Sequence, residues 1–157
     1  MEVKLKKLNE NAKLPQKGKP GDFCYDVYAI TEEEVAPNVW CYTLGFAYEF
    51  DRNNIQKIQF DKTLSDVNLA IHFFPRSSVW KTGMVLSNSV GCLDEFYRGE
   101  AKAVFYHVMP NMPRYVVGDR IGQISLGITI PLDFNWVEDI NMDTERGKGG
   151  FGSTGLK

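Results

Sequence analysis

VWCYTLGFAYEF (39–50) is the stretch that decides the fold class, because its apolar and polar side chains recur with a period close to two. Three further stretches share this period and are rich in β-branched and aromatic residues: VNLAIHFF (67–74), KAVFYHVM (102–109) and RIGQISLGITI (120–130). Clusters of Pro, Gly, Asn and Asp separate them, and no window has the pattern of a long amphipathic helix. The sequence therefore predicts a mainly β protein, with a sandwich, a jelly roll and a barrel as alternatives.

One short helix is predicted at RSSVWKT (76–82). Pro75 precedes it, Ser77 or Ser78 can cap it, and Gly83 can end it. A helix start that carries serines and an arginine suits phosphate, because its free N–H groups point outward. The alternative is an ordinary turn between two strands.

Two segments lack the β period. DRNNIQKIQFDKTLSD (51–66) is polar and is expected to form a hairpin or a long surface loop. After Trp136 the pattern is lost, and 139–157 is expected to form an extended, flexible arm. The predicted organisation is one β domain over 1–138, followed by a C-terminal arm over 139–157.

The composition is that of a soluble globular protein: 157 residues, 43% hydrophobic, 24% charged, and a formal net charge of −2. This charge gives no basic footprint, so binding along a nucleic acid backbone is not expected. The first residues have no apolar signal-like region and no segment has the length of a membrane span, so no membrane association is expected.

Few side chains can ligate a transition metal. The cysteines, Cys24, Cys41 and Cys92, are odd in number and have no CxxC spacing, which argues against a disulfide framework or a zinc site. Each stands among apolar or aromatic neighbours and is expected to be a buried packing residue. His72 and His107 are the two histidines, so a protein cage for a transition metal is not expected.

The C-terminal stretch GKGGFGSTG (147–155) matches two nucleotide-binding patterns in part, GxGxxG and Walker A. Both patterns require a strand before and a helix after, and Ser153 stands where Walker A has its lysine, so both interpretations are rejected. The residue types still suit a nucleotide: glycines admit a close anion, and Arg146 offers a fork for phosphate oxygens. Phe151 offers a flat face for a base. The alternative is a disordered glycine-rich terminus.

Five segments, in order, resemble the five motifs of the trimeric dUTPases, which hydrolyse dUTP to dUMP and pyrophosphate. They are GDFCYDVYA (21–29), PRSSVWKTG (75–83), NSVGCLDEFYRGE (88–100), GDRIGQISL (118–126) and RGKGGFGSTG (146–155). The resemblance runs over 14–155. It implies a jelly-roll-like β-barrel that assembles as a homotrimer with shared active sites.

The third motif would supply the water-activating base and the pocket for uracil. By the resemblance, Asp94 activates the water that attacks the α-phosphorus; a carboxylate is ionised at pH 7 and can take a proton. Without the motif, an aspartate in a tight hairpin would be taken as a turn former. Tyr97 would pack under the sugar and exclude a ribose 2′-hydroxyl. Asn88 and the main chain of Gly91, Cys92 and Leu93 would contact uracil, and Lys102 is a further expected substrate contact.

The remaining motifs would hold the phosphates. Arg76, Ser77, Ser78 and Gln123 are expected to bind them, and Asp26 to support the site and the hydration of the metal. Arg146, Phe151, Gly152, Ser153 and Thr154 are expected to close over the nucleotide from a neighbouring subunit, with Phe151 stacked on uracil. The implied cofactor is Mg²⁺, held by phosphate oxygens and waters with no direct protein ligand.

The sequence departs from the motifs at Cys24, Ser78, Phe96 and Gly122, and none of these changes removes a group that the chemistry needs. Two alternatives remain. A dCTP deaminase shares the fold but needs a glutamate base and a different hairpin. A binding or signalling protein on the same scaffold would use a second partner, for which 51–66 is the place to look. The expected location is the cytoplasm, or the interior of a host cell if the chain is viral.

Overall fold

The chain is described by a computed structural model over residues 2–52 and 67–144. These residues form ten strands and one short 3-10 helix. In chain order they are β1 (Val3–Lys7), β2 (Tyr25–Tyr28), β3 (Thr31–Ala36), β4 (Val39–Thr43), β5 (Phe46–Phe50), β6 (Asn68–Phe74), η2 (Val79–Lys81), β7 (Met84–Leu86), β8 (Gly91–Asp94), β9 (Lys102–His107) and β10 (Arg120–Thr129).

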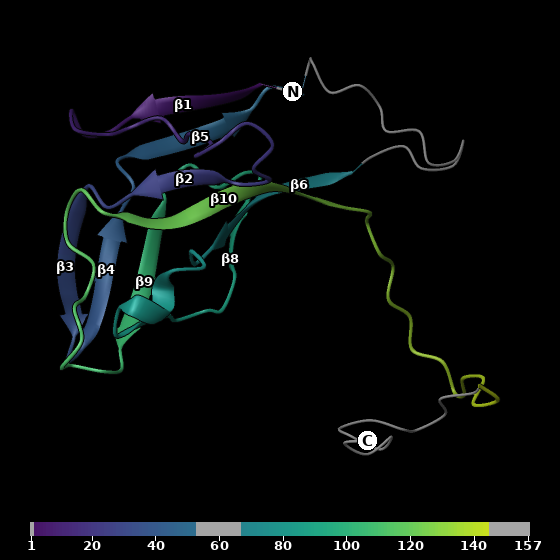
Figure 1. Ribbon diagram of the computed structural model, residues 1–157. Coiled ribbons are helices and arrows are strands. Elements are labelled where there is room, and N and C mark those ends of the chain that lie inside the picture. Colours follow the sequence, from purple (N-terminus) through teal and green to yellow (C-terminus); the bar gives the residue numbers. More distant parts are fainter. Residues whose placement is uncertain (1, 53–66, 145–157) are drawn as a thin grey trace.

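Two four-stranded sheets and one ribbon make up the fold (Figure 1). The sheets have the orders β2-β10-β6-β8 and β3-β4-β9-β7, and β1 pairs with β5 in the ribbon. The paired strands are antiparallel throughout. The prediction of a mainly β protein is confirmed.

The four stretches with a period of two form strands close to their predicted bounds. The first, 39–50, divides into β4 and β5 at Gly45, whose backbone has a φ of 76°. A Cβ at Gly45 would lie 2.8 Å from the Cβ of Ala12, so both the bend and the close approach require glycine.

The core lies between the two four-stranded sheets and is largely aromatic. Phe73 on β6 and Phe105 on β9 meet edge to face with ring centroids 6.3 Å apart. Tyr42 and Tyr115 pack edge to face 6.4 Å apart, and the Tyr42 hydroxyl donates a 2.8 Å hydrogen bond to the carbonyl of Tyr115. The buried rings thus join the sheet that carries β6 to the sheet that carries β9.

The predicted helix at 76–82 is wrong in length and type. Only η2 forms, a single 3-10 turn, and the Ser78 side chain makes no capping hydrogen bond. Thr82 turns the chain to extended geometry, with a ψ of 160°. The N–H of Gly83 then donates to the carbonyl of Pro113 as β7 begins, so strand pairing ends the helix after one turn. Among the described residues there is no α-helix, and none of their helices is long and apolar enough to cross a membrane.

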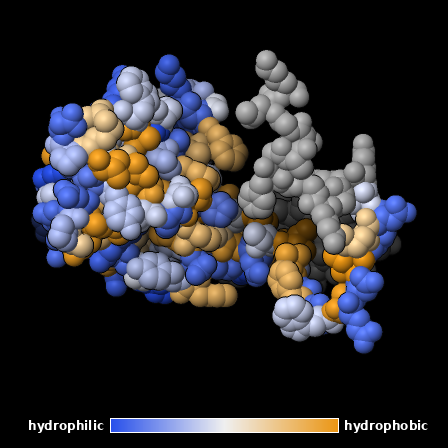
Figure 2. Space-filling model, turned by 90° about the horizontal axis from the view of Figure 1, so that it is seen from below, coloured by the Kyte–Doolittle hydropathy of each residue, from blue (hydrophilic) through white to orange (hydrophobic). Residues whose placement is uncertain are grey.

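The chain leaves the sheets after Thr129. Residues 130–144 contain no strand and run away from the sheets (Figure 1). Leu132, Phe134 and Trp136 are exposed there, and Figure 2 shows hydrophobic and hydrophilic residues mixed on this segment. The predicted boundary after residue 138 falls inside the same segment and stays a prediction.

Several predictions fall on residues outside the described ranges. They concern most of 51–66 and the arm from residue 145, including Arg146, Phe151, Gly152, Ser153 and Thr154. The expectation of three buried cysteines is wrong for Cys92, which is exposed because it faces outward from β8; Cys24 and Cys41 are half-buried.

Candidate functional site

Three neighbouring strands of one sheet bring four predicted phosphate-site residues to one hollow. Gln123 on β10 lies opposite Asp26 on β2 and opposite Phe74, the last residue of β6. The chain then leaves β6 through Pro75 to Arg76. Asp26, Arg76, Ser77 and Gln123 line an open hollow of about 670 Å³, together with Gly18, Lys19, Asp22, Phe23, Cys24 and Arg120.

The hollow is strongly polar. The Asp26 carboxylate lies between two guanidinium groups: Oδ1 is 3.4 Å from Nε of Arg76 and Oδ2 is 3.0 Å from a terminal nitrogen of Arg120. The Gln123 amide donates to the carbonyl of Pro75 at 3.4 Å. Two guanidinium groups beside a hydroxyl and an amide form a set of donors that suits a chain of phosphates.

Sequence reasoning missed six of the ten residues that line this hollow, among them Lys19, Phe23 and Arg120. Arg120 belongs to one of the five motifs and could have been predicted. A half-buried carboxylate such as Asp26 needs cationic partners. Lys19 and Phe23 belong to the loop before β2, whose path the sequence does not specify.

Two predicted contacts do not line the hollow. The Ser78 carbonyl accepts a hydrogen bond from the N–H of Lys81 in the 3-10 turn, and the Ser78 side chain makes no capping hydrogen bond. Lys102 begins β9 in the other sheet, opposite Thr43. Neither residue is brought together with Asp26 and Arg76.

The predicted uracil pocket is an edge strand. β8 pairs with β6, with Gly91 opposite Phe73 and Asp94 opposite Ala70, and β8 is the last strand of its sheet. Asn88 stands just before it. The outer edge of β8 therefore presents main-chain N–H and C=O groups with no strand partner among the described residues, as a site that reads the edge of a base requires.

Tyr97 closes the turn after β8. Its N–H donates to the carbonyl of Asp94 at 3.0 Å, and its hydroxyl donates to the carbonyl of Glu100 at 3.0 Å. A Cβ at Gly99 would overlap the Tyr97 ring, so glycine lets the ring lie flat on the turn. The ring stays partly exposed, at 43%, and can contact a sugar.

Asp94 combines an exposed side chain with a fixed backbone. Its carbonyl accepts a 2.5 Å hydrogen bond from the hydroxyl of Tyr48, a buried residue. Burial, with a smaller contribution from the Asp94 charge, raises the pKa of Tyr48 to about 12. The tyrosine therefore remains a donor, and the Asp94 carboxylate is free to face solvent.

Within one chain, the hairpin and the hollow are far apart. Asp94 lies opposite Ala70, whereas Gln123 lies opposite Phe74 on the other side of β6. Four residues of strand span about 13 Å, and two strand spacings add about 10 Å across the sheet. The carboxylate of Asp94 and the phosphate-site donors of the same chain therefore do not converge on one group.

Asp26 is the residue of the hollow that was expected to support a hydrated metal ion. Over 2–52 and 67–144, no group of three or more His, Cys, Asp and Glu side chains is placed to hold an ion. Asp26 is the one carboxylate in the hollow whose two oxygens both contact arginines. It can hydrogen-bond to the water shell of an ion that arrives with phosphates.

The chain matches the family model for dUTPase over residues 10–155. It is 31% identical to the deoxyuridine 5′-triphosphate nucleotidohydrolase of Helicobacter pylori (strain Shi470), over 99% of this chain and 98% of the relative. It is 30% identical to the enzyme of the same name from Yarrowia lipolytica, over 99% and 90%.

Solved structures agree on the fold. The dUTPase of Staphylococcus bacteriophage 80alpha, a mutant with dUpNHpp, superposes with a TM-score of 0.73 at 19% identity, over 99% of both chains. A mutant dUTPase from phage phi11 of S. aureus, described for its coordination of a structural Mg(II) ion, gives a TM-score of 0.65 at 15% identity, over 89% of this chain and 99% of the phage chain.

Proposed function

This chain belongs to the dUTPase family and hydrolyses dUTP, and from this premise we propose how its residues divide the work. Asp94 takes a proton from a water molecule whose oxygen attacks the α-phosphorus. The bond from this phosphorus to the bridging oxygen breaks, and dUMP and pyrophosphate leave. The observation that carries the assignment is the exposed Asp94 carboxylate on a backbone held by the buried hydroxyl of Tyr48.

The base and the sugar are read by the hairpin. The unpaired edge of β8, from Gly91 to Leu93, offers fixed main-chain groups to uracil, and Asn88 contacts the same pocket. A wrong base leaves these groups desolvated and unpaired, which disfavours its binding. The Tyr97 ring lies under the deoxyribose and leaves no room for a 2′-hydroxyl.

The phosphates lie in the polar hollow. Arg76, Ser77 and Gln123 donate to their oxygens, and we add Arg120 to this set because it shares Asp26 with Arg76. Mg²⁺ would be held by phosphate oxygens and waters, with Asp26 hydrogen-bonded to those waters. When bound, the ion neutralises phosphate charge, and catalysis is otherwise positioning by these donors.

The separation of the two halves supports the proposal of a homotrimer with shared sites. Adjacent phosphates share a bridging oxygen, so the water-activating base and the phosphate donors must meet around one triphosphate. Asp94 and Gln123 of one chain are too far apart to do so. The hollow of one subunit therefore takes the hairpin of a neighbour, and the arm with Arg146 and Phe151 comes from a neighbouring subunit as well.

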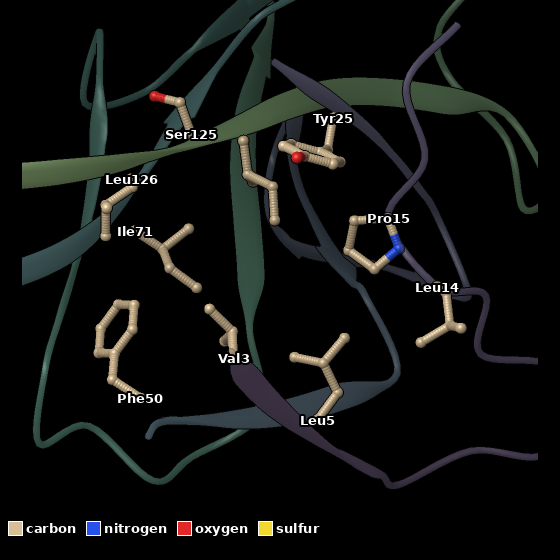
Figure 3. Close-up of a pocket in the computed structure, with 10 residues that line it drawn as sticks. Val3, Leu5, Leu14, Pro15, Tyr25, Phe50, Ile71, Ser125 and Leu126 are labelled. Carbon is tan, nitrogen blue, oxygen red and sulfur yellow. The ribbon is translucent and has the colours of Figure 1, made fainter. Parts of the chain in front are cut away.

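An apolar groove supports this assembly. It has a volume of about 450 Å³ and is lined mostly by apolar side chains. Figure 3 shows Val3, Leu5, Phe50, Ile71 and Leu126 around it, from β1, β5, β6 and β10. The outer edge of β1 has no strand partner among the described residues. We propose that the segment 130–137 of a second copy, which precedes the arm, lies in this groove.

The segment 130–137 has the pattern for such a strand. Leu132, Phe134 and Trp136 alternate with Asp133 and Asn135, the period of an extended strand with one apolar face. These apolar side chains are exposed, and Trp136 is fully so. A strand added to β1 would bury them in the groove.

The base assignment is tested by Asp94→Asn. We expect this variant to lose turnover by roughly 10²- to 10⁴-fold while it still binds a non-hydrolysable dUTP analogue, since the amide keeps the shape and loses the proton acceptor. Pyrophosphate release and analogue binding by calorimetry give the two readouts. Normal turnover would refute the assignment.

Substrate selectivity separates the alternatives. Pyrophosphate release is measured with dUTP, dCTP, dTTP and UTP side by side, and release from dUTP alone is expected. Ammonia release from dCTP would indicate a deaminase, which needs a glutamate base. Glu95, the glutamate beside Asp94, is buried and paired with Arg52, so the hairpin offers aspartate to the solvent instead. The expected location, the cytoplasm or a host cell interior, stays a prediction.

A further inference from the structure

Glu95 is a buried charge directly beside the proposed base. Its residue is 7% exposed. The carboxylate pairs with Arg52 through both oxygens: Oε1 accepts from Nε, and Oε2 accepts from a terminal nitrogen at 2.6 Å. Oε2 also accepts the N–H of Leu69 at 3.2 Å. The Arg52 hydrogen bond outweighs burial and lowers the pKa of Glu95, so the site holds a carboxylate anion.

Arg52 joins three parts of the chain at this point. It follows β5, it reaches Glu95 on the hairpin, and a terminal nitrogen donates to the carbonyl of Val67, just before β6, at 3.1 Å. The Glu95 carbonyl accepts a further hydrogen bond, at 2.7 Å, from Arg98. The end of β8 is thus tied to β5 and to β6 by a charged fork and not only by strand pairing.

The geometry sets the direction of Asp94. Asp94 is the last residue of β8 and Glu95 is the first residue of the turn after it, and here Glu95 is buried while Asp94 is exposed. A fixed, inward Glu95 therefore keeps Asp94 outward. We propose that the Arg52–Glu95 ion pair positions Asp94 for water activation, an inference that rests on Asp94 as the base.

A positioning pair and a merely stabilising pair predict different kinetics. Loss of stabilisation lowers the melting temperature and leaves the folded enzyme as active as before. Loss of positioning lowers kcat in the folded enzyme and leaves KM nearly unchanged, because the phosphate donors lie in the hollow and the uracil contacts at Gly91–Leu93 are held by pairing with β6. Small displacements of a reacting group are costly, since catalysis depends on its alignment.

The test uses Arg52→Met, Glu95→Gln and the double variant in the full chain. Kinetics are measured with dUTP at a temperature where circular dichroism shows each variant fully folded. Each single change is expected to lower kcat roughly 10- to 100-fold, with KM within about threefold. The double variant should be no slower than the slower single one, because both changes break the same pair. Arg52→Lys keeps the charge without the fork and should give an intermediate kcat.

The chain offers a matched control on the other sheet. Arg114 pairs with Glu32 at 3.0 Å, Glu32 also accepts a backbone N–H from Val117 at 3.0 Å, and Arg114 donates to the carbonyl of Tyr115 at 2.8 Å. These contacts are of the same kinds as those of Arg52, and Arg114 in addition lies over the Trp40 ring, 3.7 Å from its centroid. Arg114→Met should lower the melting temperature and leave kcat unchanged.

The outcomes distinguish the two proposals. If Arg52→Met and Glu95→Gln behave as Arg114→Met does, or if kcat and KM change in parallel, the positioning role is overturned. If Asp94→Asn keeps turnover, the base assignment fails, whatever the pair does. Should Glu95→Gln or Arg52→Met not fold, Arg52→Lys still decides, because lysine keeps a cation beside the buried Glu95 carboxylate.

Discussion

Tyr48 is the residue whose ionisation should report on the hairpin at the scale of a single side chain. Its pKa is raised from 10.0 to about 12, with burial as the main cause. The folded protein then holds this proton more tightly than the unfolded chain does. The associated stability is fully present below pH 10 and is lost as the pH rises towards about 12.

Tyr48→Phe removes both this titration and the hydrogen bond to the Asp94 carbonyl. We expect a loss of about 1 kcal/mol of stability at pH 8 and a smaller deficit relative to wild type at high pH, where the wild-type protein loses its own advantage. Urea unfolding of both proteins at several pH values measures this. A deficit that is constant up to pH 11 would contradict the raised pKa.

At the scale of elements, the prediction concerns Gly45, where the chain bends between β4 and β5. Gly45→Ala places a side chain where φ is 76° and where a Cβ would lie 2.8 Å from Ala12. We expect a loss of at least about 2 kcal/mol, since the left-handed backbone alone costs roughly 1–2 kcal/mol. Gly21→Ala is the control, because Gly21 has a φ of 94° and nothing lies within 4 Å of its Cβ position. Equal losses in urea unfolding would rule out the contact with Ala12.

Elements with one buried face could be predicted from the sequence, and elements without one could not. β6 and β10 fall within a residue or two of 67–74 and 120–130, because their apolar residues alternate toward the core. β1 and β3 are polar, mostly exposed strands that carry little of this pattern. The helix over 76–82 failed because capping residue types also occur in turns, and strand β7 starts too soon for a helix to continue.

At the scale of the molecule, residues that belong to the five motifs could be predicted to share a site. Pairs of distant residues outside the motifs could not be predicted. Asp26, Arg76, Ser77 and Gln123 do line one hollow. The partner of Glu95 lies 43 residues away in the chain, in a segment with no motif. Such pairing depends on the folded path of β5 and β6, which local pattern does not encode.

The number of subunits depends on contacts between whole chains, and two truncations test it. Removing 146–157 should leave a trimer that turns over poorly, because the strand-like segment 130–137 remains while the groups proposed to close the site are lost. Removing 130–157 should in addition leave the apolar groove at Val3 and Leu5 empty and give monomers. Light scattering coupled to size-exclusion chromatography gives the mass of each, and kcat/KM with dUTP gives the activity. A trimer that persists without residues 130–157 would show that segment 130–137 does not bridge the subunits. Full activity without 146–157 would show that the end of the arm takes no part in catalysis.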